Sequence, residues 1–456
     1  MPTAPDWPLP YAAPVSREAR VAYVLRHLRM AYPMLPDISI GYADTQPQIL
    51  VQEASNGFFE QQRPYPAAPN YRKWLGRKIP FFFDPHPEKP LPDLLPEGRA
   101  IIHADVLSAA FFLLSGWQEY YCEERDQHGR FPYAASVQKQ YDFVTIPVVN
   151  YYFDVLKTAV EHATGQSLPP RRWTNNAPFA TCITHDVDNL YSAWKAPAKA
   201  ALQRRDWLGF GRQLWRHFTQ KDAWDNLEEV QQAVAQYGAK STFFFLTEHR
   251  KAADAPPNAD YRIGRLLPRL QQLAATGTEL ALHGSIGTAI NEIKLLLERS
   301  RLPFYTQGNR FHYLSWVPLR TPLSLHNAAF MYDSTLGFAE HFGFRNSYCL
   351  PFIPYDLLCD GSTNFIELPL NVMDTTLHNP RYLQLDPNEV LPALLPMLLE
   401  IELFGGVCTV LWHNQNFDPA NTHNGPRQFH ELMRYLRSRS AAFLTGTEVS
   451  SEMVKW

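Results

Sequence analysis

The sequence predicts an α/β protein: a parallel sheet or barrel in its second half, preceded by a separate α/β domain. In the second half, short apolar runs alternate with stretches that have the spacing of amphipathic helices. Four of these apolar runs end in histidine, aspartate or arginine. A polar segment with three prolines, residues 167–178, separates the two halves. We therefore expect an N-terminal domain over residues 1–175 and a second domain over residues 176–456.

The composition is that of a globular protein. Hydrophobic residues make up 45% and charged residues 19% of the 456, and the net charge of −3 argues against bulk nucleic-acid binding. The sequence contains no run of about 18 apolar residues, the length needed to span a membrane. The first residues lack a basic segment followed by an apolar one, so we expect no secretory signal and a cytoplasmic protein. The five cysteines form no C-x-x-C pair and indicate a reducing compartment without a disulfide framework.

In the first half, the Pro-rich residues 1–17 predict an extended arm. Apolar residues three and four positions apart predict helices at 18–30, 105–122 and 147–162. Short strands are predicted at 38–42 and 48–52. The Pro-rich stretch 63–98 predicts a loop region around the apolar run 81–83.

In the second half, strands and helices are predicted to alternate. The predicted strands are 179–184, 241–246, 279–283, 305–310, 330–333, 365–370, 407–412 and 442–444. The predicted helices are 223–237, with Asp222 as its N-cap, and 263–275, 290–299, 323–329, 388–403 and 427–437. Because the strands of such folds are parallel, their carboxyl ends meet at one edge, where we expect the chemistry to lie.

A long helical insertion at residues 196–220 follows the first strand of this series. It interleaves basic residues with aromatic and aliphatic ones. Such a segment can be a basic amphipathic surface for a membrane or an anionic polymer. More commonly it is the solvated face of a helix that covers the sheet, and both interpretations remain open.

Polar residues at four strand ends are candidates for a metal-dependent hydrolytic site. In chain order they are His185, Asp186 and Asp188, then His283, then Arg310, His312 and Tyr313, and finally His413. Facing carboxylates and imidazoles can hold a divalent metal and move a proton. Asp186 and Asp188 could instead cap a helix or close an Asx-turn, and a lone histidine there is usually structural. Four such strand ends on one edge favour a shared site.

The ordered motifs ITHDVD, ELALHGS, RFHY and VLWH resemble those of the polysaccharide deacetylases, the NodB-homology or carbohydrate esterase family 4 group. The resemblance runs from residue 179 to the C-terminus and implies a distorted (β/α) barrel with a divalent metal, commonly zinc. It implies hydrolysis of a C–N amide bond, removing an N-acetyl group from an amino sugar in a glycan or glycan precursor. The N-terminal half resembles a domain of unknown function that precedes such a domain in a bacterial subgroup.

The resemblance also implies roles for the matched residues. Asp188 and His283 fall on metal ligands. The catalytic positions are Asp186 for the general base, Arg310 for the arginine that orients it, Tyr313 for a backbone N–H that holds the oxyanion, and His413 for the general acid.

Two departures from the family pattern qualify these roles. Val187 separates two aspartates that are usually adjacent, and Gly287 stands where the family has its second metal histidine. We expect His312 to be the third ligand, with His185 as the alternative; His312 could also contact substrate. Asp333 resembles an acidic residue of the fourth motif, although a turn or capping role is equally consistent. Because of Gly287, a catalytically degenerate fold that binds a glycan or a partner protein remains the alternative function.

Overall fold

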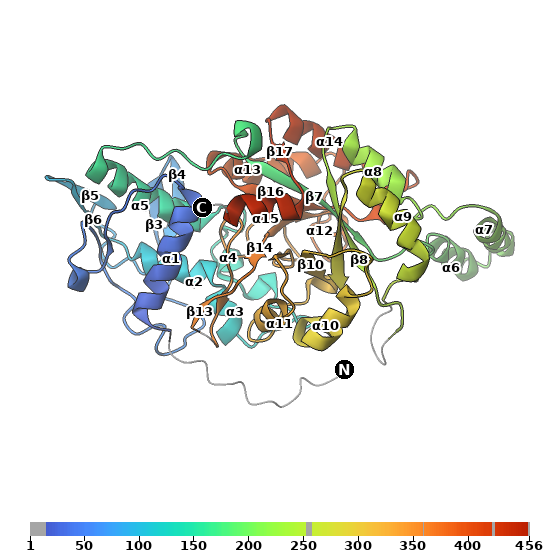
Figure 1. Cartoon of the computed structure of the whole chain (residues 1–456), viewed down its shortest axis with the longest axis horizontal. Helices are drawn as coiled ribbons and strands as arrows, with labels where there is room; N and C mark the ends of the chain where they lie inside the picture. Colours follow the sequence, from blue (N-terminus) through green and yellow to red (C-terminus); the bar gives the residue numbers. More distant parts are fainter. Residues whose placement is uncertain (1–14, 252–257, 359, 422–424, 455–456) are drawn as a thin grey trace.

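The computed structural model describes residues 15–251, 258–358, 360–421 and 425–454. Residues 1–14, which include most of the predicted arm, and Cys359 lie outside the described residues. Figure 1 shows an N-terminal α/β region beside a larger region in which helices surround a strongly curled sheet. The four described cysteines are free and buried.

The N-terminal region is built on a four-stranded sheet in the order β1-β2-β6-β5, in which only β5 runs antiparallel to its neighbour. A separate antiparallel hairpin pairs β3 with β4. The strands are β1 (Ile40–Gly41), β2 (Ile49–Val51), β3 (Asn70–Trp74), β4 (Arg77–Phe81), β5 (Pro92–Leu95) and β6 (Arg99–Ile102). The helices are α1 (Arg17–Ala31), α2 (Val106–Leu114), α3 (Trp117–Tyr121), α4 (Val137–Gln140) and α5 (Val148–Thr164).

Two predictions for this region were wrong. The stretch 63–98, predicted as loop from its prolines, contains β3, β4 and β5. Pro80 lies in a two-stranded hairpin and Pro92 begins an edge strand, positions where a missing N–H is tolerated. The single helix predicted at 105–122 is two helices, because Gly116 takes a φ of +70° between α2 and α3.

The second region is built on a nine-stranded sheet in which every strand pair is parallel. Its path is β14-β11-β10-β9-β8-β7-β16-β15, and β17 pairs with the start of β7. Only Leu368 and Pro369 separate β14 from β15, the two ends of this path. The sheet therefore curls round until its ends are joined by the chain, which confirms the predicted α/β barrel.

The bounds of this region are as follows. The strands are β7 (Ala180–Val187), β8 (Ser241–Leu246), β9 (Glu279–Gly284), β10 (Gly308–Phe311), β11 (Tyr332–Asp333), β14 (Ile366–Glu367), β15 (Leu370–Met373), β16 (Val407–Leu411) and β17 (Ala442–Phe443), with a small hairpin of β12 (Tyr355–Asp356) and β13 (Gly361–Ser362). The helices are α6 (Lys195–Gln203), α7 (Trp207–Thr219), α8 (Leu227–Ala235), α9 (Ile263–Ala275), α10 (Glu292–Arg299), α11 (Thr321–Asn327), α12 (Asp374–His378), α13 (Val390–Leu403), α14 (Pro426–Ser438) and α15 (Gly446–Val454).

The predicted alternation of strands and helices is present, with four differences in detail. β7 continues beyond the predicted end at residue 184 as far as Val187. The helix predicted from residue 223 begins at Leu227, and its predicted cap, Asp222, instead accepts hydrogen bonds from the backbone N–H groups of Ala193 and Trp224. The strand predicted at 365–370 is two strands, and α12 and α15 were not predicted.

The two regions share one hydrophobic core. Polar contacts reinforce it: the Tyr23 hydroxyl donates to the carbonyl of Ile353, whose N–H donates to Nε2 of His27. Tyr23 and His27 belong to α1, whereas Ile353 lies more than 300 residues later in the chain. The predicted domain boundary after residue 175 stays a prediction.

A buried ion pair also joins the two regions. Arg345, between β11 and β12, donates to both carboxylate oxygens of Glu119 on α3, at 2.7 and 2.6 Å. Both side chains are almost fully buried. Removing one partner would leave the other charge buried and unpaired.

Replacing Glu119 by glutamine should therefore lower the free energy of unfolding by about 3–5 kcal/mol. The exposed pair of Arg439 and Glu402 has the same two-bond geometry and serves as the control. There, Glu402→Gln should cost much less than Glu119→Gln, because solvent screens the charges. Urea unfolding of both variants measures the difference, and equal losses would contradict the expected contribution of the buried pair.

Candidate metal centre

The candidate site lies at the carboxyl ends of β7, β9, β10 and β16. Asp186 is part of β7 and Asp188 directly follows it. The register of β9 and β10 sets His283 beside Arg310. His312 begins a short 3-10 helix directly after β10, and His413 comes two residues after β16. The parallel sheet thus brings these residues to one edge, as the sequence predicted.

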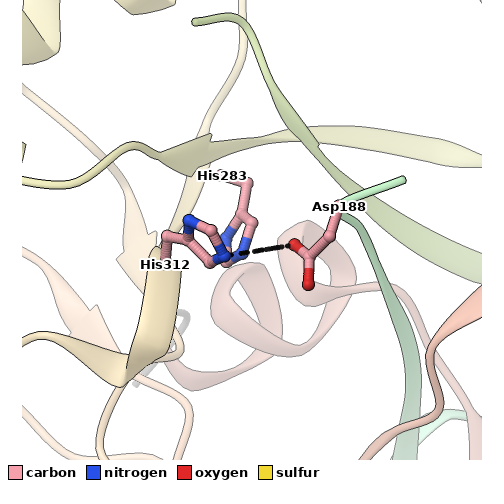
Figure 2. Close-up of side chains that lie close together, drawn as sticks. All are labelled: Asp188, His283 and His312. Carbon is pink, nitrogen blue, oxygen red and sulfur yellow. Dashed lines mark ion pairs between the residues drawn. The ribbon is translucent and has the colours of Figure 1, made fainter. Parts of the chain in front are cut away.

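Asp188, His283 and His312 converge on a common point (Figure 2). Oδ1 of Asp188 lies 3.4 Å from Nε2 of His283 and 3.6 Å from Nε2 of His312. One ligand atom from each of the three residues can be chosen so that all lie within 4.8 Å of one another. Two imidazoles from neighbouring strands therefore face one carboxylate.

The donor set fits a divalent ion such as zinc. Nδ1 of His283 lies 2.8 Å from the carbonyl oxygen of Arg310, which can only accept a hydrogen bond. Nδ1 therefore carries a proton, which leaves Nε2, the nitrogen that faces Asp188, as the atom that would hold a metal ion. Oδ1 of Asp188 is buried, and within the described part of the chain it has no hydrogen-bond partner. A buried carboxylate oxygen without a donor is costly, and a cation would satisfy it.

The charges of Asp188 and His312 also suit a cation. Burial alone would raise the pKa of Asp188, but the neighbouring His312 and His283 lower it well below its ordinary value. Burial lowers the pKa of His312 to about 4 despite the nearby Asp188. A carboxylate that stays ionised and an imidazole that stays neutral near pH 7 are the protonation states that a metal requires.

Asp186 is held beside this group by Arg310. Nη1 of the fully buried Arg310 donates to Oδ1 of Asp186 at 2.9 Å and to the hydroxyl of Thr184 at 2.8 Å. Its other nitrogens donate to the carbonyl and hydroxyl oxygens of Ser334. The second oxygen of Asp186 lies 3.7 Å from Nε2 of His283. The guanidinium therefore aims one carboxylate oxygen at the candidate metal position.

His413 is held from another side by Asp374, a residue that the sequence analysis did not identify. Nδ1 and the backbone N–H of His413 donate to the two oxygens of Asp374, both at 2.7 Å, and Asn416 also donates to Asp374. Nε2 of His413 lies 4.0 Å from Asp188. Burial alone would lower the pKa of His413, but Asp374, Asp188 and Asp186 raise it to about 10. His413 is therefore protonated at neutral pH.

A signal for Asp374 was present in the sequence. Leu370–Met373 is an apolar strand, and Asp374 follows it directly, as the other candidate residues follow theirs. The predicted strand ended at residue 370, three residues before the end of β15 at Met373, so Asp374 was not recognised as a residue at a strand end.

Three other residues from the sequence analysis lie away from the cluster. Successive residues of a strand point to opposite faces, so His185 points away from Asp186. Its Nδ1 bonds the carbonyl of Trp412, and its ring packs against aromatic side chains, including Phe243. Asp333 is fully buried, where Asn309 donates to it. Gly287 has a φ of +86° in the turn before α10.

A cavity of about 340 Å³ opens over the cluster. Its walls include Tyr313, Arg381 and Tyr382, together with His128 and Arg130 from the N-terminal region. His128 stacks on the ring of Tyr313 at 4.7 Å, and Arg130 donates to the Tyr313 carbonyl at 2.9 Å. The N-terminal region therefore forms part of the wall, which no local sequence pattern indicated.

Comparisons with known proteins give a family match for the N-terminal region and distant structural similarities for part of the chain. Residues 16–165 match the model of a family of unknown function, DUF7033. No curated protein matches the chain. Similar solved structures include a putative polysaccharide deacetylase from Mycobacterium smegmatis (16% identity, 63% of this chain and 94% of that chain, TM-score 0.43). Another is the Puue allantoinase, with 9% identity over 61% of this chain and 91% of that chain and a TM-score of 0.41. A third is a probable polysaccharide deacetylase from Pseudomonas aeruginosa PAO1, with 10% identity over 63% of this chain and 94% of that chain and a TM-score of 0.41.

Among the described residues, no helix is both long and apolar enough to cross a membrane.

Proposed function

We propose that the protein is a metal-dependent hydrolase of non-peptide C–N amide bonds, which removes N-acetyl groups from an amino sugar in a glycan or glycan precursor. The observation that carries the proposal is the order of groups around one point. On one side of the three-residue ligand set lies the carboxylate of Asp186, which Arg310 holds in place. On the other side lies the protonated His413, which the carboxylate of Asp374 holds in place. Amide hydrolysis needs a base and an acid in this arrangement.

Asp188, His283 and His312 would hold the metal, zinc being the ion that suits these ligands best. Three protein ligands are typical of catalytic zinc sites, which keep one position open. When bound, the ion would polarise the amide carbonyl and lower the pKa of water at the open position. His312 replaces the second metal histidine of the family pattern, whose position is occupied by Gly287 in this chain.

Asp186 acts as the base. Its ion pair with Arg310 keeps one oxygen directed at the ligand cluster, where it takes a proton from the water that attacks the carbonyl carbon. Arg310 is itself fixed by Thr184 and Ser334, so the carboxylate cannot rotate freely. The backbone N–H of Tyr313 is the proposed donor to the oxyanion.

His413 acts as the acid. The amide nitrogen leaves as an amine and must gain a proton as the C–N bond breaks. His413 is protonated at neutral pH, and its Nε2 faces the cluster while Nδ1 is occupied by Asp374. Water thus adds across the C–N bond, and the products are a carboxylic acid and a free amine.

The cavity suits a sugar unit. A pocket of about 340 Å³ is in the range of small-ligand sites, and Tyr313 and Tyr382 combine flat apolar rings with hydroxyl groups. Asn379 and Arg381 add polar groups at the same wall. Such a mixture can bind the face and the hydroxyl groups of a pyranose ring.

Metal content of protein purified without added metal is the first test. We expect about one equivalent of zinc or a similar ion in the wild type. His312→Ala should weaken metal binding by more than about 100-fold, the largest effect expected of residues that only support a ligand. His128→Ala is the matched control, because this histidine lines the same cavity but lies outside the ligand cluster. It should keep the metal.

Acetate release from N-acetylated oligosaccharides then tests the reaction. Metal loss in His283→Ala but not in His312→Ala would make His312 a substrate contact and remove it from the ligand set. A wild type that binds no metal even when zinc is supplied would rule out the hydrolase. The better account would then be an inactive deacetylase-like fold that binds a glycan or a partner protein.

A further inference from the structure

The helical insertion after β7 does not cover the sheet. It forms a hairpin of α6 and α7, which pack against each other, and the buried residues of the two helices are Ala198, Ala201 and Gly209. Figure 1 shows this hairpin extending away from the barrel, beyond α8 and α9. The commoner interpretation of the basic insertion, a covering helix with a solvated face, therefore does not apply.

The outer face of α7 exposes large apolar side chains. Leu208 is 86% exposed, Phe218 79%, Trp207 69% and Trp215 61%. At about 100° per residue, these four lie within an arc of roughly 100° on the helix surface. Leu208 and Phe218 are the two most exposed large apolar side chains among the described residues. A soluble surface rarely carries such a group without a partner.

The charge of the hairpin is opposite to that of the whole protein. Residues 195–220 contain six basic residues and a single acidic one, while the chain as a whole carries −3. The acidic residue, Asp206, is used to cap α7, where it accepts from the N–H of Gly209. Arg212 and Arg216 are exposed and follow the apolar arc on one side, roughly 40° and 80° beyond Leu208. A partner for this face must therefore be apolar in its interior and negatively charged at its surface.

The base of the hairpin is fixed beside the candidate site. Asn414, the residue after His413, donates to the carbonyl of Asn189 on one side of the base and to that of Trp224 on the other. Asp260 accepts from the N–H groups of Leu190 and Tyr191. The hairpin thus leaves the barrel at the same edge of the sheet as the ligand cluster.

We infer that the α6–α7 hairpin binds the surface of a lipid bilayer that contains anionic lipids. Trp207, Leu208, Trp215 and Phe218 enter the boundary between headgroups and acyl chains, as the apolar face of an interfacial helix does. Arg212 and Arg216 lie against the negative headgroups. A docked protein holds its ligand cluster close to the bilayer, because the hairpin is anchored next to His413.

Flotation of the full-length protein with vesicles tests this inference. The wild type should bind vesicles of phosphatidylglycerol and phosphatidylcholine, and bind much less to phosphatidylcholine alone. The variant W207S/L208S/W215S/F218S should lose binding. Arg212→Gln with Arg216→Gln should weaken it by roughly 30-fold, at about 1 kcal/mol for each basic residue near the surface. The matched control is Ile293→Ser with Leu297→Ser on α10, which are also exposed apolar residues but lie on another helix.

The control variant should bind vesicles like the wild type, and all variants should keep the metal content of the wild type. A wild type that does not bind anionic vesicles, or a fourfold serine variant that binds as well as the wild type, would overturn the inference. Dimers that dissociate in the serine variant, without vesicle binding, would instead make this face a contact between two copies. Binding of heparin without vesicle binding would assign it to an anionic polymer.

Discussion

Asp186→Asn should lower kcat for acetate release by about 10³-fold and leave the metal content near that of the wild type. General bases contribute about 10²–10⁴-fold to such reactions. Asparagine has the shape of aspartate, and its carbonyl oxygen can still accept from Arg310, so the surroundings of the base are preserved. The amide cannot take a proton from water. Steady-state kinetics and metal analysis of the same preparation measure both effects.

The matched control for this variant is Asp126→Asn. Asp126 also pairs with a guanidinium beside the cavity, that of Arg130, but it lies outside the ligand cluster. Its replacement should change kcat by less than about tenfold, since no proton transfer depends on it. If Asp186→Asn lost the metal together with activity, Asp186 would be a ligand and not the base. Unchanged activity would assign the base to another group.

Asp374→Asn should lower kcat/KM by about 10²-fold at neutral pH, with a smaller loss at acidic pH. Asp374 is the charge closest to His413 and, with Asp188 and Asp186, raises the pKa of His413 to about 10 against the effect of burial. Removing this charge lowers the pKa of His413. An acid must be protonated to act, and a group is protonated below its pKa. The alkaline limb of the pH–rate profile should therefore move to lower pH.

A double-mutant cycle separates this positioning role from a general loss of stability. If Asp374 acts through His413, Asp374→Asn should have little further effect on kcat/KM in a His413→Ala background. A full additional loss in that background, or an alkaline limb that stays in place in the single variant, would contradict the role. Asn416→Ala, which removes another donor to Asp374, should shift the limb less, because asparagine carries no charge.

Most of the candidate site residues at strand ends could be predicted, because each of them comes at or directly after the end of a buried apolar run. Asp188, His283 and His413 were identified in this way and lie on one edge of the sheet. Asp374 was missed for a local reason, a strand end placed at residue 370 when β15 runs to Met373. The strands in the Pro-rich stretch 63–98 were missed because edge strands tolerate the prolines that central strands exclude.

The sequence left open whether His312 or His185 lies beside Asp188 and His283, and in the structure it is His312. A strand ending at residue 184 would have left the direction of His185 undefined. β7 runs on to Val187, so alternation turns His185 to the face opposite Asp186, where it packs among aromatic rings. His312 points inward because it follows β10, which pairs with the strand that carries His283.

Local apolar periodicity predicted most of the order of strands and helices in the second region, and the parallel direction of its strands predicted the edge at which the candidate residues gather. Which side chains meet there became evident only from the three-dimensional arrangement. Asp374 meets His413, Arg130 reaches Tyr313 from the N-terminal region, and the α6–α7 hairpin stands away from the barrel. These relations depend on register, on strand facing and on contacts between distant parts of the chain. No local pattern encodes them.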